Sequence, residues 1–226
     1  MKKLIYLILI LFLFSSYTFA YVDPWYKFKS DWTPLMKGIF HNRDRKIDRL
    51  INKADSSYLN YVSWTGLSAL NVAIRLRDSA TVEKLLLTKK IVIDPHRDMM
   101  NLACVFNCFE IVKLLFQYGF PIFSSEGYST SLCSACKHDD IRTVDFLIKN
   151  GVDVNQQYNE NSYTPLIIAT MHANIEIVEL LLQNGADKEI IVKHSGQKAL
   201  DFVDRKGLPK ETSDDDFTKL LKLLTD

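Results

Sequence analysis

The chain has 226 residues, of which 47% are hydrophobic and 24% are charged, and its formal net charge at neutral pH is +1. This composition is ordinary for a folded protein and excludes an intrinsically disordered chain. The near-zero net charge gives no electrostatic reason to expect a nucleic-acid partner, because proteins that bind phosphate backbones carry a basic excess.

The first 20 residues have the pattern of a secretory signal peptide. Lys2 and Lys3 precede an unbroken apolar run over residues 4–14, and the small side chains of Thr18 and Ala20 suit a signal peptidase. An uncleaved membrane anchor is the alternative, but a spanning helix needs about 20 apolar residues. We therefore expect an exported protein, bacterial by its composition and periplasmic or secreted, that meets the membrane only through this segment before cleavage.

Residues 21–32 form a short aromatic lead-in to the rest of the chain. Trp25, Phe28 and Trp32 are expected to fold over the first element that follows and to act as an N-terminal cap. An aromatic docking peptide is the alternative function for this stretch.

The rest of the chain repeats itself. In the clearest copy, residues 161–189, Thr164 can cap a helix and Pro165 suits the first helical position. Asn174 is expected to allow a tight turn before a second helix. Residues equivalent to Leu166, here called the anchors, recur at intervals of 30 to 35 residues: Leu35, Leu70, Met100, Leu132 and Leu200.

Further positions recur at fixed distances from each anchor. Three residues after it stands Gly38, Ala73, Ala103, Ala135, Ala169 or Val203. Twelve residues after it stands Ile47, Val82, Val112, Val144 or Val178, and fifteen after it Leu50, Leu85, Leu115, Leu147 or Leu181. Nineteen after it stands Gly119, Gly151 or Gly185, a residue typical of helix ends. Two helices this short cannot bury an apolar face alone, so each copy is predicted to pack against its neighbours.

This period, with its TPLxxA, ExVxLL and GAD-like blocks, resembles the ankyrin repeat. The resemblance implies an all-α solenoid of helix-turn-helix repeats joined by short hairpin loops, which we call fingers. Five to six repeats would occupy residues 33–226, the last of them a C-terminal cap. The function implied is protein binding through the concave face and the fingers.

Two parts of the array depart from the pattern. The link into the third repeat contains Asp94 and Pro95 and is short, so its finger is expected to be truncated. The sixth repeat is interrupted at residues 207–209. A last helix, capped by Ser213 or Asp214, is predicted to cover the end of the stack with an apolar stripe formed by Phe217, Leu220, Leu221 and Leu224.

No sequence motif predicts an enzyme. The chain lacks a GxSxG elbow, a phosphate-binding glycine loop, an HExxH pair and a calcium-loop pattern. We therefore expect no catalytic residue, no cofactor and no metal site.

The cysteines allow an alternative function. Cys104 and Cys136 follow their anchors by four residues, where a small buried side chain is expected, and free cysteine behaves as a small hydrophobe. Cys133 and Cys136, however, form a CxxC pair at a predicted helix start, where the pKa of a thiol falls. The alternative is a thiol/redox- or metal-dependent protein of the cell envelope that uses this pair.

Candidate partner-binding residues occupy the fifth and sixth positions after the anchor, which commonly face the partner in similar ankyrin proteins. They are Arg75, Leu76, Val105, Phe106, Lys137, His138, Met171 and His172. For the histidines, a merely solvated surface is an equal alternative. Trp64, Tyr158 and Tyr163 in the expected fingers are further candidates, because tryptophan and tyrosine most often anchor interfaces. The expected partner is an unidentified protein, bound by a monomer.

Overall fold

The computed structural model describes residues 31–94, 96–122, 131–157, 162–204 and 207–225. They belong to two compact units, one within residues 1–69 and the other within residues 70–226. The described residues form helices joined by turns and loops, without a strand, which confirms the predicted all-α repeat fold. None of the described helices is long and apolar enough to cross a membrane. The predicted signal peptide, Trp25 and Phe28 lie outside the described residues.

The first unit contains α4 (Pro34–Phe40), α5 (Asp44–Lys53) and α6 (Ser56–Leu59). Thr33 caps α4, since its Oγ1 accepts a hydrogen bond from the amide of Met36 at 3.2 Å. Trp32 is 3% exposed and packs edge-on against Phe40, with ring centroids 5.7 Å apart. Trp32 thus packs on the first helix of the repeat array, while the cap as a whole stays a prediction.

Helix α5 packs on α4 through a different residue from the one predicted. Ile47 is buried, but four residues later it is Ile51 that joins the core, while Leu50 is only half-buried. Positions three and four after Ile47 lie on the same helix face, so the spacing alone does not decide between them.

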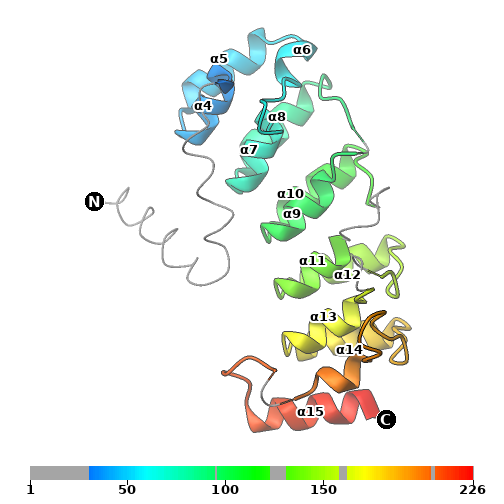
Figure 1. The fold of residues 1–226 in the computed structure, drawn as a ribbon. Helices are drawn as coiled ribbons and strands as arrows, with labels where there is room; N and C mark the ends of the chain where they lie inside the picture. Colours follow the sequence, from blue (N-terminus) through cyan, green and yellow to red (C-terminus); the bar gives the residue numbers. More distant parts are fainter. Residues whose placement is uncertain (1–30, 95, 123–130, 158–161, 205–206, 226) are drawn as a thin grey trace. The chain divides into compact units, whose positions relative to one another are not determined.

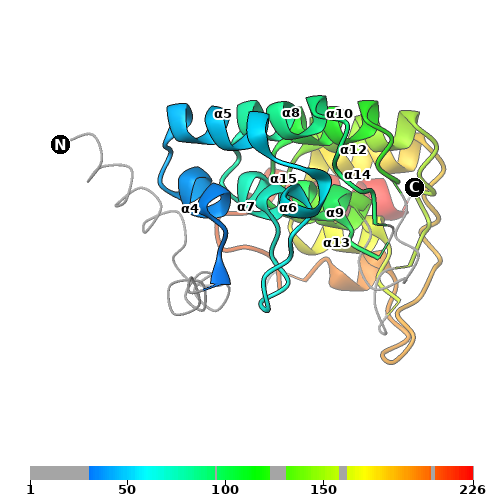
Figure 2. The same ribbon diagram turned by 90° about the horizontal axis from the view of Figure 1, so that it is seen from above.

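The second unit is built from two rows of short helices, shown in Figures 1 and 2. The inner helices are α7 (Ala69–Arg75), α9 (Met99–Val105), α11 (Ser131–Lys137) and α13 (Pro165–Met171). The outer helices are α8 (Ser79–Leu87), α10 (Phe109–Gln117), α12 (Ile141–Lys149) and α14 (Ile175–Gln183). Helix α9 packs on α11 and α11 on α13, while α8, α10, α12 and α14 pack in sequence behind them.

The core of the second unit lies between the two rows. The anchors of the second to fifth repeats are at most 3% exposed, and the alanine three residues after each of them is fully buried. The valine twelve residues after and the leucine fifteen after are also fully buried in these repeats. The predicted register is therefore confirmed in these four repeats.

A left-handed residue makes the tight turn between the inner and outer helix of each repeat. In the fifth repeat this residue is Ala173, with φ of 55°, and not the Asn174 that the sequence suggests. The equivalent residues are Arg77, Asn107 and Asp139, with φ between 49° and 57°. Gly185 has φ of 86° at the end of α14, the conformation expected of a glycine that ends a helix.

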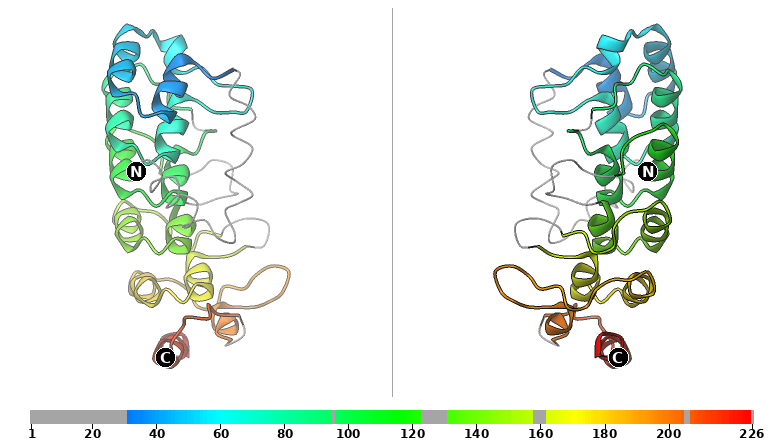
Figure 3. Two further views of the ribbon diagram at one scale, coloured as in Figure 1. Left: turned by 90° about the vertical axis from the view of Figure 1, so that its left-hand side faces the viewer. Right: turned by 90° about the vertical axis from the view of Figure 1, so that its right-hand side faces the viewer.

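The fingers are the links from an outer helix to the next inner helix, and their described parts stand on one side of the helix rows in Figure 3. The link over residues 88–98 is the shortest; the others span residues 118–130, 150–164 and 184–198. The prediction that the finger leading into the third repeat is truncated is confirmed.

The last repeat packs on the fifth, but it does not form the usual pair of α-helices. A single 3-10 turn, η2 (Ala199–Phe202), packs on α13, and the anchor Leu200 is only half-buried. Helix α15 (Asp214–Thr225) packs on α14 and η2. The Oγ of Ser213 accepts a hydrogen bond from the amide of Asp216 at 3.1 Å. Of the two predicted caps, Ser213 is therefore the one that caps α15.

We predict that Ala169→Leu lowers the stability of the fold by about 1–3 kcal/mol or more, because a larger side chain has no room at a fully buried position between packed helices. Ala80→Leu is the matched control, since Ala80 is exposed on α8. Urea unfolding of both variants measures the difference. An unchanged midpoint for Ala169→Leu would show that the helices do not pack closely there.

Candidate functional site

Eight of the predicted partner-binding residues lie together in the second unit, and we call them the inner row. Each of the four inner helices contributes its last residue and the residue after it: Arg75 and Leu76 at α7, Val105 and Phe106 at α9, Lys137 and His138 at α11, and Met171 and His172 at α13. Leu76 and Val105 are 39% and 38% exposed, and Lys137 and His172 are also exposed. The other four are half-buried. The row is accessible to a partner.

Within the row, an arginine covers an aromatic ring of the next repeat. The Arg75 guanidinium carbon lies 5.6 Å from the centroid of the Phe106 ring, a cation–π contact. The backbone of Phe106 is held in turn, because its amide donates to the Leu102 carbonyl at 3.1 Å. This pair presents a flat apolar surface with a positive charge on it.

Hydrogen bonds between repeats fix the backbone directly behind the row. Arg77 donates to the carbonyl of Asn107 at 2.9 Å, and the Asn107 side-chain amide donates to the carbonyl of His138 at 3.2 Å. Asn174 donates to the carbonyl of Cys136 at 2.6 Å. Sequence reasoning missed these links, although the side-chain amides at positions 107 and 174 were a visible signal. The ends of the inner helices are therefore connected across repeats.

Three basic side chains from two repeats gather at one end of the inner row. Burial lowers the pKa of His138, and the charges of Lys137 and His172 lower it further. Burial and then Lys137 also lower the pKa of His172. Mutual effects of this kind require proximity, so the structure brings these three predicted residues together.

The predicted finger residues differ in their surroundings. Tyr163 is half-buried, and its ring packs edge-on against Phe202 with centroids 6.1 Å apart, so it joins the fifth repeat to the sixth. Trp64, in the first unit, is 62% exposed, and its amide donates to an Asp31 carboxylate oxygen at 2.6 Å. Tyr158 lies outside the described residues.

A side-chain amide connects two neighbouring fingers at their base. Asn155 donates to the carbonyl of Gly185 at 3.0 Å and accepts from the amide of Asp187 at 2.8 Å. The Asp187 carboxylate in turn accepts from the amide of Glu189 at 2.8 Å. The two fingers therefore share one orientation at their base, a link that the sequence interpretation did not include.

The cysteine pair does not have the environment of a reactive thiol. Cys133 and Cys136 are 1% and 0% exposed, and neither they nor Cys104 form a disulfide. Burial raises the pKa of Cys136, and the neighbouring thiols raise it further. The expectation that a helix start would lower this pKa is wrong, because burial disfavours the thiolate and Cys136 lies near the end of α11, not at its start. The described residues also contain no cluster suited to a metal ion.

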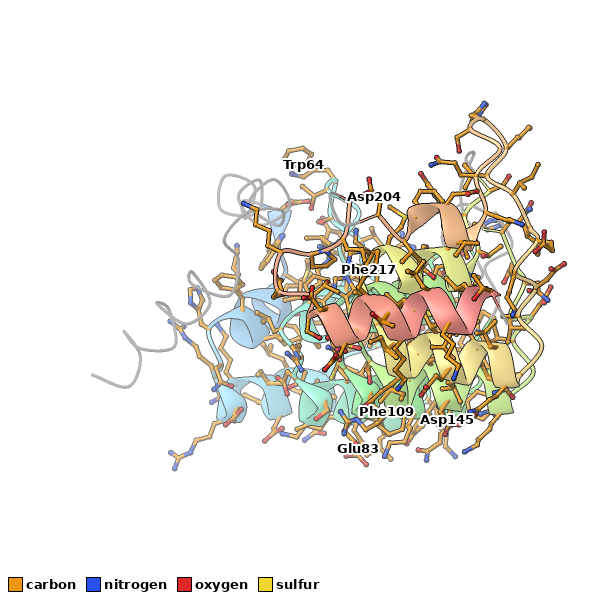
Figure 4. All side chains as sticks on the ribbon, turned by 90° about the horizontal axis from the view of Figure 1, so that it is seen from below. Trp64, Glu83, Phe109, Asp145, Asp204 and Phe217 are labelled. Atoms are coloured by element: carbon orange, nitrogen blue, oxygen red, sulfur yellow. The ribbon has the colours of Figure 1, made fainter. Side chains whose placement is uncertain are left out.

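The sequence interpretation also missed an aromatic cluster on the outer helices. Phe146 of α12 packs edge-on against Phe109 and Phe116 of α10, with centroid distances of 5.9 and 5.4 Å. Lys113 and Arg142 lie over the Phe109 ring at 4.9 and 5.2 Å. Figure 4 shows Phe109 on the outer helices, along with Glu83 and Asp145. Two basic side chains thus cover the Phe109 ring of this cluster.

The two histidines predict a pH dependence of stability. Their pKa in the folded protein lies below the ordinary value of 6.5, so the unfolded chain binds protons more readily. This contribution to stability is complete above about pH 6.5 and is lost as the pH falls towards the folded-state pKa. The urea midpoint should therefore fall more between about pH 7.5 and 5 in the wild type than in the double variant His138→Gln, His172→Gln. His194→Gln, in an exposed finger, is the control. An equal fall in the double variant and the wild type would contradict the prediction.

Comparison with known proteins supports the assignment of the repeats. Residues 100–192 match the family model for ankyrin repeats in three copies. The structure is similar to the human ASB11 ankyrin repeat domain, with a TM-score of 0.69, 20% identity, and coverage of 86% of this chain and 83% of that one. It is also similar to EF0377, an ankyrin repeat protein, with a TM-score of 0.70, 23% identity, and coverage of 85% and 96%. No curated protein has a significantly similar sequence. Residues 100–192 are ankyrin repeats, and the chain has the ankyrin-repeat fold.

Proposed function

We propose that this protein is exported and acts, as a monomer, by binding another protein through its inner row and fingers. Ankyrin repeats generally mediate protein–protein interaction. The inner row would form the floor of the concave face, and the fingers would form its side. The mechanism is presentation of a rigid surface, with no chemical step.

The observation that carries the proposal is the combination of exposed side chains with a fixed backbone. Leu76 and Val105 are each more than one-third exposed although they are apolar. The links from Asn107 to His138 and from Asn174 to Cys136 hold the helix ends on which the row stands. A surface fixed before binding loses little conformational entropy when a partner docks, which favours affinity.

Export is proposed from the sequence of the first 20 residues. The two lysines, the apolar run and the small residues before Tyr21 together support a signal peptide that is removed. The buried thiols are compatible with an oxidising compartment, because thiolate character and exposure govern oxidation.

Export has a direct test. We predict that the mature protein, purified from the cells that produce it, begins at Tyr21, because the small side chains of Thr18 and Ala20 precede that bond. N-terminal sequencing measures this. A protein that still begins at Met1 would contradict the export proposal.

The binding face can be tested with two phenylalanines of the third repeat. Phe106 is half-buried in the inner row, and Phe116 is 38% exposed on the outer helix α10. After a partner has been captured from the compartment that holds the mature protein, Phe106→Ala should weaken its binding by about 2 kcal/mol or more, the usual cost of removing a central aromatic contact. Phe116→Ala should leave the affinity unchanged.

Calorimetric titration of the captured partner gives both affinities, and thermal unfolding shows whether each variant remains folded. Weak binding of Phe116→Ala together with unchanged binding of Phe106→Ala would place the interface on the outer helices and contradict the proposal. Leu181→Ala provides a stability reference, since Leu181 is fully buried and its truncation should cost about 2–5 kcal/mol.

A further inference from the structure

The inner row carries charge of one sign only. At its eight positions stand one arginine, one lysine and two histidines, and no carboxylate. The chain as a whole has nearly equal numbers of basic and acidic residues, so this distribution is a local property of the row. A surface of one sign attracts partners of the opposite sign and discriminates against others.

The charges are concentrated where α11 and α13 end. Lys137 and His172 are exposed and His138 is half-buried, and Lys137 influences the pKa of both imidazoles. Among the described residues, no carboxylate forms an ion pair with any of the three. Other exposed lysines do have such partners, as Lys149 has in Asp145 at 2.7 Å.

Several carboxylates stand on segments that neighbour the cluster in the chain or in the next repeat. Asp139 is in the turn after α11. Burial has the largest effect in raising the pKa of Asp139, and the nearby charge of Glu176 of α14 raises it further. Asp140 is 4% exposed and accepts from the Thr143 hydroxyl at 2.7 Å. Asp204 follows η2 in the next repeat. In the repeat before the cluster, the end of α9 contributes Phe106, which is uncharged. The shifts on both imidazoles come from burial and neighbouring basic groups, not from these carboxylates.

The cluster is held in place before any partner arrives. The amide of His138 donates to the Ser134 carbonyl at 3.1 Å, and that of His172 donates to the Ile168 carbonyl at 3.2 Å. The Asn174 bond to the carbonyl of Cys136, at 2.6 Å, joins the two repeats next to Lys137. Three basic side chains on a fixed backbone suit a ligand that carries several negative charges in a row.

We propose that the ends of α11 and α13 bind an acidic segment of the partner protein, with Lys137 as the permanent positive charge and His138 and His172 as two charges gained on acidification. The proposal rests on the proposed function, because it assigns a chemistry to the partner of the inner row. A carboxylate-rich segment stabilises the imidazolium form, so each histidine takes up a proton from solvent as the complex forms. By linkage, the affinity must then rise as the pH falls.

The test uses the full mature chain and a labelled peptide of alternating glutamate and serine, with a glutamine-serine peptide as its neutral counterpart. Glutamate has a pKa of about 4.3, so the probe stays charged between about pH 5.5 and 7.5. Fluorescence anisotropy should show about five- to tenfold tighter binding at the lower pH, as two modest charge pairs would give. High salt should remove most of this gain in affinity, because exposed charges are screened.

Variants separate the three basic groups. His138→Gln with His172→Gln should abolish the pH dependence of binding, while Lys137→Gln should weaken binding at both pH values. Lys149→Gln is the matched control in the same repeat, since that lysine is on the outer helix α12. Binding that does not depend on pH, equal binding of the neutral peptide, or an unchanged pH dependence in the double histidine variant would each overturn the inference.

The captured partner distinguishes this inference from the proposed function. A partner that is lost with Phe106→Ala but is insensitive to pH and to Lys137→Gln would overturn the acidic-segment inference and leave the proposed binding face intact. A partner that is insensitive to Phe106→Ala and to all three basic-residue variants would overturn both.

Discussion

A helix pair of seven and nine residues cannot bury an apolar face by itself, and the whole second unit depends on this constraint. Helix α9 packs on α11 and α11 on α13, and the outer helices α8, α10, α12 and α14 pack in sequence behind them. The small residue three positions after the anchor allows this close approach, as fully buried Ala135 and Ala169 show. Stability is therefore shared between neighbours, and a surface that runs along the stack is fixed by the same contacts that hold the core together.

The spacing of apolar residues predicted which side of each helix meets another, and the resemblance of this pattern to the ankyrin repeat predicted the fold. The anchors and their companions in the second to fifth repeats are buried as their periodicity indicates. Periodicity was insufficient where two neighbouring positions share a face, as with Leu50 and Ile51, and where a helix shortens to a single turn, as at Leu200. In both places the outcome depends on packing partners, which the local pattern does not contain.

In the candidate site too, some features could be predicted from the sequence and others could not. That residues such as Val105 and Lys137 face outwards follows from helical geometry, and sequence was sufficient to place them. The links made by Asn155 and Asn174 connect residues 30 or more positions apart, so they depend on the distance between repeats. For Cys136, the position within the helix pointed to an activated thiol, but burial has the larger effect on its pKa. The magnitude of desolvation cannot be judged until the surrounding residues are known.

Helix α15 covers the last helix pair of the described array. It packs on α14 and η2 where another helix pair could otherwise follow, and Lys219 forms an ion pair with Glu179 of α14 at 2.9 Å. Its other side exposes Asp215 and Lys222, which offer no apolar surface to a further repeat. An uncovered α14 would expose apolar surface to another copy of the protein. Head-to-tail association through such surfaces forms open filaments when the rotation between copies does not close a ring. The twelve residues of α15 thus occupy a surface of α14 that would otherwise be open to such association.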